Sequence, residues 1–160
     1  MHESDLVLFA TGTTGVTSII HKTGLPESIL YLLGVLNSTL ISFNTVNHSP
    51  IFSGAYYKFS APYLKQIPIR IIDFTSPADV TRHDSMVSLV TAILDLHKQL
   101  AAARTADEKT ALQRLIAVTD SEIDRLVYDL YDLTEKEIRI VEGRGEDNPD
   151  ARRTDNETAH

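Results

Sequence analysis

The chain has 160 residues, of which 42% are hydrophobic and 23% are charged. These proportions are ordinary for a globular protein of one domain, or of one domain with an appendage, and they exclude wholesale disorder and collagen-like structure. The sequence contains no Cys, which excludes thiol catalysis, thiolate metal sites and disulfides. It has neither an apolar run of the roughly 18 residues that a membrane helix needs nor a basic signal-peptide start. We therefore expect a cytoplasmic protein that does not bind a membrane.

Charge divides the chain into two parts. The net charge is −7, from 15 basic and 22 acidic residues. Residues 1–82 carry five of each and are neutral, whereas residues 83–160 carry ten basic and seventeen acidic residues. We therefore predict an α/β subdomain over residues 1–82 and a helical unit over residues 83–142. The remaining residues, 143–160, have almost no apolar side chains and are predicted to form a disordered tail.

The first half predicts strands and one buried helix. Short β-branched runs at residues 5–9 and 16–20, separated by a Gly-containing loop, indicate two strands. Residues 26–43 are apolar nearly all round and begin with a proline, which suits the first position of a buried helix. Asn37 and Ser38 interrupt this helix, most simply by bonding to its backbone near a bend or an end, although a direct ligand role is the alternative. Residues 67–72 indicate a third strand.

The second half predicts helices. Apolar residues alternate at spacings of three and four from residue 86 to residue 103, and again from residue 112 to residue 130. A very short break near Arg104 favours an antiparallel helical hairpin over residues 82–131, with one kinked helix as the alternative. Capping boxes begin at Thr105 and Thr134, the second of them before a short helix over residues 135–141. The predicted fold is α+β, with a small mixed sheet packed on the buried helix and a long helical hairpin after it.

No set of residues in the sequence indicates catalysis. The sequence lacks a His-Glu-x-x-His motif, a nucleophile elbow and a Gly-x-Gly-x-x-Gly loop. The acidic residues of the second half fall mainly opposite the apolar seam, so a solvated face is the simplest interpretation. Carboxylate pairs such as Glu122 and Asp124 have nothing that places them in a pocket. We expect neither catalytic nor metal-binding residues in this chain.

Residues 44–65 are the candidate DNA-binding segment. Short polar and aromatic side chains there could reach base edges, two lysines could neutralise phosphates, and a glycine would let the backbone approach a phosphate closely. The hairpin, which carries the negative excess, would repel phosphates. The alternative is a structural loop with Tyr56 and Tyr57 packed on the core. The candidate residues are Asn44, Asn47, His48, Ser53, Gly54, Tyr56, Lys58 and Lys65.

Several motifs, taken together in their order and spacing, carry a family resemblance. They are YLLGVLNS at residues 31–38, FSGAYYKF at 52–59, YLKQIPI at 63–69, IDRLVYDLY at 123–131 and LTEKEI at 133–138. Over about residues 25–142 the chain resembles the TaqI-like C-terminal specificity domain. That domain belongs to type IIG restriction–modification enzymes and related adenine-specific DNA methyltransferases.

The resemblance implies a target recognition domain that reads double-stranded DNA for a methyltransferase, and often a nuclease, on the same chain. The amino-methylase signature Asn-Pro-Pro-Tyr and a Phe-x-Gly-x-Gly loop are both absent from this sequence. We therefore expect a C-terminal fragment that is not catalytic by itself. S-adenosylmethionine and Mg²⁺ would be needed only by the missing methyltransferase and nuclease domains, which would be its partners. The alternative is a helical protein–protein interaction module that forms a homodimer through the hairpin.

Overall fold

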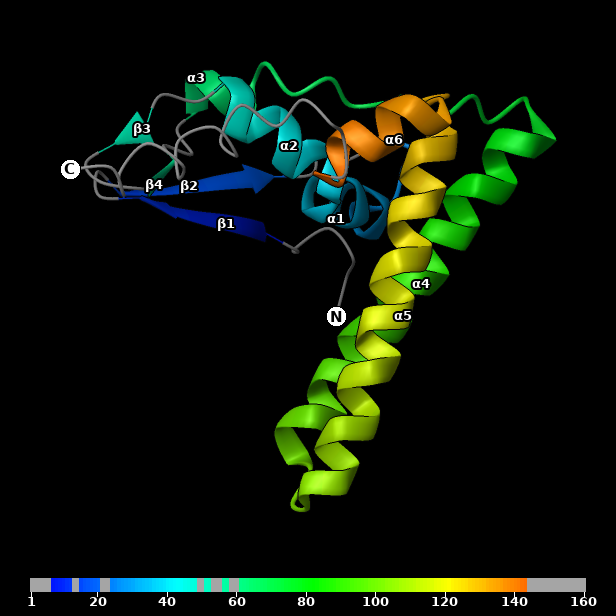
Figure 1. Cartoon of the computed structure of the whole chain (residues 1–160). Helices are drawn as coiled ribbons and strands as arrows, with labels where there is room; N and C mark the ends of the chain where they lie inside the picture. Colours follow the sequence, from blue (N-terminus) through cyan, green and yellow to red (C-terminus); the bar gives the residue numbers. More distant parts are fainter. Residues whose placement is uncertain are drawn as a thin grey trace.

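The computed structural model describes residues 7–12, 15–20, 24–48, 51–52, 56–57 and 61–143 (Figure 1). Helices dominate this part of the chain. The elements in chain order are β1 (Val7–Gly12), β2 (Gly15–Ile20), α1 (Ile29–Asn37), α2 (Thr39–His48), β3 (Ile51–Phe52), β4 (Tyr56–Tyr57), α3 (Ala61–Leu64), α4 (Pro77–Ala102), α5 (Ala106–Leu130) and α6 (Glu135–Val141).

The predicted helical hairpin is confirmed. Helices α4 and α5 lie side by side and antiparallel, and their far end projects well beyond the rest of the molecule (Figure 1). The chain turns at Ala103, whose extended backbone ends α4 and excludes one kinked helix. Thr105 then begins α5 with the predicted capping box: its side chain accepts from the Glu108 N–H, and the Glu108 carboxylate accepts from the Thr105 N–H at 3.1 Å. Thr134 caps α6 in the same way.

The predicted α+β fold with a mixed sheet is wrong, because the core of the described chain is helical. In the part of the chain that the structure describes, β1 pairs with β2 and β3 pairs with β4, each as an isolated antiparallel two-stranded ribbon. Residues 67–72, the predicted third strand, form no strand and run as an extended strap from α3 toward α4 (Figure 1). No mixed sheet therefore packs on the buried helix.

Two tyrosine hydroxyls bond to the backbone of the strap, as a neighbouring strand would do in a sheet. Tyr31 of α1 donates to the carbonyl of Arg70 at 2.8 Å. Tyr131, just after α5, donates to the carbonyl of Pro68 at 2.7 Å and accepts from the Arg70 N–H at 3.1 Å. A tyrosine hydroxyl is a protonated donor at neutral pH, and burial is the main cause that raises the pKa of both phenols further. The strap thus satisfies backbone groups through side chains from α1 and from the end of α5.

The predicted helix over residues 26–43 is in fact two helices. The first begins later than expected, because Ser28 is its N-cap and the helix starts at Ile29 rather than at Pro26. It ends at Ser38, where α1 and α2 meet at an angle of 61°. The Ser38 hydroxyl donates to the carbonyl of Val35 at 2.7 Å, which confirms the local side-chain-to-backbone bond expected at a bend.

The core forms where α1 lies against α4 and α5. Residue 82, the boundary seen in the composition, falls inside α4, and residues from both sides of it share this core. The closest approach is at Gly34, where an added Cβ would collide with the Met86 Sδ and lie 2.8 Å from the Val90 Cγ2. The buried members of the core are Tyr31, Val35, Ile41, Ile72, Met86, Val90, Ile123, Val127 and Leu130.

Within the described residues, no single helix is both long and apolar enough to cross a membrane. Helices α1 and α2 meet that requirement only as a pair, and they are bent by 61° at the break between them.

Replacing Gly34 by Ala tests the close approach of α1 to α4. In an open helix this change would stabilise the protein by about 1 kcal/mol. Here the new methyl group collides with buried side chains, so we expect a net loss of about 1–2 kcal/mol in the free energy of unfolding. The cavity left by Met86→Ala should accept the methyl group, and the double variant should therefore lose less than the sum of the two single changes. Additive losses in denaturant unfolding would contradict this packing.

Candidate nucleic-acid interface

Three of the predicted DNA-binding residues lie on the last two turns of α2. Asn47 and His48 are exposed, and Asn44 is half-buried. The Asn47 amide donates to the carbonyl of Phe43 at 2.8 Å, and the His48 Nδ1 lies 2.8 Å from the carbonyl of Asn44. An Asn amide has two donors and one acceptor oxygen, so this single bond still allows Asn47 to address a base edge.

The remaining candidates lie around the β3–β4 ribbon and α3. Tyr56 belongs to β4, where its backbone pairs with Phe52. Lys65 is exposed in the turn that follows α3. The structure brings α2, α3 and this ribbon to one side of the molecule, far from the free end of the hairpin (Figure 1). Ser53, Gly54 and Lys58 lie outside the described residues, as does the side chain of Tyr56.

This side of the molecule is polar rather than strongly basic in its described part. Between residues 44 and 66, Lys65 is the one Lys or Arg that the structure describes. The C-terminal carbonyls of α2 add a partial negative charge, which is unfavourable for a phosphate. Phe43 and Val46, both partly exposed at 36% and 44%, add apolar surface. The arrangement therefore suits contacts to bases better than strong neutralisation of the phosphate backbone.

Arg70 of the strap and Arg82 of α4 are occupied by ion pairs. Asp79, at the start of α4, is 7% exposed, and it lies 3.1 Å from Arg82 and 3.7 Å from Arg70. Arg82 also reaches Asp129 of α5 at 2.9 Å. The Asp79 carboxylate accepts from the Asp73 N–H as well, at 3.2 Å. These groups hold the strap to the hairpin, and they are a structural network rather than a binding surface.

Helix α2 is anchored at its first residue by a carboxylate that the sequence did not single out for this role. Asp124 of α5 accepts from the Thr39 N–H at 2.8 Å and from the Thr39 hydroxyl at 2.6 Å. A carboxylate at the first turn of a helix satisfies an unpaired N–H and interacts favourably with the helix dipole. We interpreted Asp124 as part of a solvated face, and its partner lies 85 residues away, so no local pattern could have revealed it.

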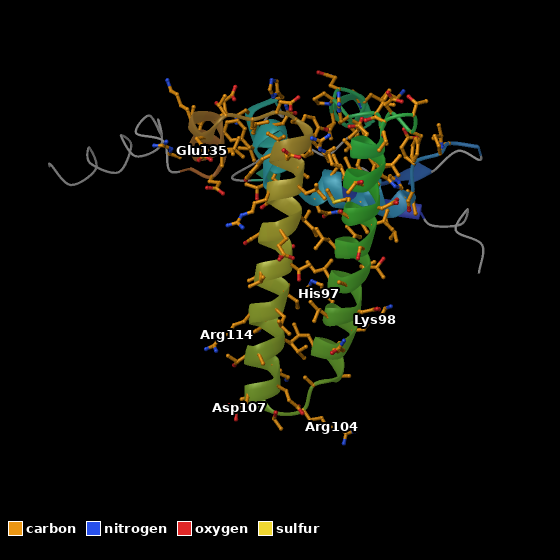
Figure 2. All side chains as sticks on the ribbon, turned by 90° about the vertical axis from the view of Figure 1, so that its right-hand side faces the viewer. His97, Lys98, Arg104, Asp107, Arg114 and Glu135 are labelled. Atoms are coloured by element: carbon orange, nitrogen blue, oxygen red, sulfur yellow. The ribbon has the colours of Figure 1, made fainter. Side chains whose placement is uncertain are left out.

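Asp124 also lines a pocket of about 460 Å³ beside the contact between α1 and α4. Asp120, one turn earlier, shares this pocket, and burial followed by the charge of Asp124 raises its pKa. His97 of α4 acts in the opposite direction and lies between α4 and α5 in Figure 2. Among the described residues, no group of three or more His, Asp or Glu side chains could hold a metal ion. The lining residues are Leu33, Gly34, Asn37, Thr39, Val90, Ile93, Leu94, His97, Asp120, Ile123 and Asp124.

The two neighbouring carboxylates should respond oppositely to the same substitution. Asp124→Asn weakens the cap on α2 and should lower the free energy of unfolding by about 1 kcal/mol. Asp120→Asn removes a charge that the folded state disfavours, so it should raise the melting temperature at pH 7. Because the folded state raises the Asp120 pKa, this gain should vanish as the pH falls below the ordinary aspartate value of 3.8. Melting curves from pH 3 to pH 7 test both expectations, and equal losses for the two variants would contradict them.

Comparison with known proteins relates the chain to restriction–modification enzymes. It is 26% identical over 133 residues to the type II restriction enzyme and methyltransferase RM.Eco57I of Escherichia coli. The match covers 82% of this chain but only 13% of that protein. No protein-family model matches the chain, and no solved structure matches it. The similarity therefore supports an association with restriction–modification enzymes, of which this chain corresponds to a small part.

Proposed function

We propose that the chain is the DNA-sequence recognition part of a restriction–modification enzyme, related to the TaqI-like C-terminal specificity domains. The observation that carries the proposal is the similarity to the restriction enzyme and methyltransferase, which extends over 82% of the chain. In this role the chain binds double-stranded DNA and is not catalytic by itself. Methyl transfer and cleavage belong to methyltransferase and nuclease domains elsewhere in the enzyme.

The way that α2 is held supports a reading role for its far end. Its first residue, Thr39, is fixed to α5 by two hydrogen bonds, and α2 also contacts α6. Its last residues, Asn47 and His48, are exposed. Side chains that discriminate between bases must be positioned accurately, and Asn is well suited to bonding an adenine edge. A helix anchored at one end that presents Asn and His at the other meets this requirement.

Under this proposal, S-adenosylmethionine and Mg²⁺ serve the other domains of the enzyme. This chain contributes sequence recognition and part of the affinity for DNA.

Substitutions at the end of α2 should change which DNA sequence is preferred. Asn47→Ala and His48→Ala should alter the sequences selected from a pool of random duplexes. Lys65→Ala should instead weaken binding to all sequences and reduce the salt dependence by about one phosphate contact. A matched control is Asn37→Ala, because the exposed Asn37 amide donates to the carbonyl of Leu33 just as the Asn47 amide donates to that of Phe43.

This selection experiment distinguishes a base-contacting role of the end of α2 from a purely structural role. Asn37→Ala should select the same sequences as the parent chain. If Asn47→Ala and His48→Ala also select the parental sequences with parental affinity, the end of α2 does not read bases. If the parent chain fails to bind duplex DNA at low salt, the proposed function itself is wrong.

A second candidate is a helical interaction module, which exposed apolar residues of the hairpin favour. Leu115 and Val118 lie about one turn apart on α5 and are 52% and 57% exposed. Such a pair suits the surface of a second copy of the chain. Light scattering should then give the mass of a dimer for the parent and of a monomer for Leu115→Ser with Val118→Ser. A monomeric parent would exclude the homodimer.

A further inference from the structure

The negative charge of the hairpin is confined to one of its ends. From residue 94 to residue 118, around the turn between α4 and α5, four basic and three acidic residues give a net charge of +1. At the other end of the hairpin, residues 77–93 and 119–130 carry two basic and six acidic residues, which give −4. We refer to residues 94–118 as the hairpin tip. The net charge of the whole hairpin predicts that it repels phosphates, but the charge of its tip has the opposite sign to that of its other end.

Most of the acidic groups at the tip are already engaged. Asp95 pairs with Lys98 at 2.8 Å. The Glu108 carboxylate accepts from the backbone N–H groups of Arg104 and Thr105, which lowers its pKa and fixes it in the cap of α5. Asp107 lies in the first turn of α5, where its charge complements the helix dipole. The charge of these carboxylates is therefore directed largely at local partners.

Three cations at the tip are without such partners. Arg104, Lys109 and Arg114 are exposed, and in the described part of the chain none of them forms an ion pair. Figure 2 shows Arg104 and Arg114 pointing away from the helices at the far end of the hairpin. Lys109 and Arg114 are five residues apart on α5, which corresponds to about 7.5 Å along its axis. Because each residue of an α-helix also adds about 100° of rotation, the two side chains leave α5 in directions about 140° apart.

We propose that Arg104, Lys109 and Arg114 at the hairpin tip bind the phosphate backbone of duplex DNA. This inference rests on the proposed function, and it adds a contact far from the end of α2 (Figure 1). Charge complementarity favours DNA as the occupant, because its phosphates are negative and the exposed cations surround a narrow projecting end of the protein. Contacts of this kind fix the position of a protein on the duplex without reading its sequence. The tip thus supplies the affinity that the polar end of α2 lacks.

The salt dependence of DNA binding measures the phosphate contacts of the tip directly. The parent chain and a triple variant with Arg104→Gln, Lys109→Gln and Arg114→Gln would be titrated with a fluorescent random-sequence duplex at several salt concentrations. Each lost phosphate contact reduces the slope of log K against log salt by about 0.9, so the triple variant should lose about 2 to 3 from that slope. Its sequence preference should stay that of the parent.

The matched control removes three cations away from the tip, one near the end of α5 and two on α6, through Arg125→Gln, Lys136→Gln and Arg139→Gln. Both triple variants have the same net charge, so a change caused only by net charge would affect them equally. The inference predicts a reduced slope for the tip variant and a nearly parental slope for the control. Parental binding by the tip variant, or equal changes in both variants, would overturn the tip contact but leave the proposed function standing. A parent chain that does not bind DNA would overturn both.

Discussion

The rest of the structure depends on the close approach of α1 to α4 at Gly34. The Met86 and Val90 side chains occupy the space that a Cβ at this position would need. At this distance, the ends of α1 reach partners that are remote in sequence. The Ser28 N–H donates to the buried His83 at 3.0 Å, and Thr39, just beyond the other end, reaches Asp124. A side chain at residue 34 would push α1 outward and strain both contacts.

This arrangement bears on the proposed function, because it fixes α2 relative to the hairpin. The bend at Ser38 turns the chain, and Asp124 holds the start of α2 against α5. The candidate base contacts at the far end of α2 and the cations at the hairpin tip then lie at opposite ends of one body (Figure 1). A recognition unit of this shape can separate reading the sequence from holding the phosphate backbone. The restriction enzyme and methyltransferase to which the chain is similar is much longer, because the match covers only 13% of that protein.

The sequence predicted best those elements whose position is determined by local signals. Apolar spacing and two capping boxes located α5 and α6 almost to the residue, because each cap bonds within three residues of itself. Residues 67–72 carry the β-branched pattern of a strand, but their backbone bonds to the hydroxyls of Tyr31 and Tyr131, which lie 39 and 61 residues from Arg70. The role of Asp124 was hidden for the same reason. Summed charge likewise concealed the difference between the two ends of the hairpin. For the candidate interface, residue type alone suggested Asn47 and His48 as base contacts, and the structure places both at the exposed end of α2.

Native-state hydrogen exchange tests most directly whether α1 and the hairpin form one body. If they share a core, amides in α1 and in the parts of α4 and α5 that contact it should exchange with the same free energy of opening. Added denaturant should lower these values together. The tip of the hairpin should exchange more easily, because it lies beyond the core. Rapid exchange throughout α1 while the contacting parts of α4 and α5 remain protected would contradict the account, because α1 would then be a separate unit.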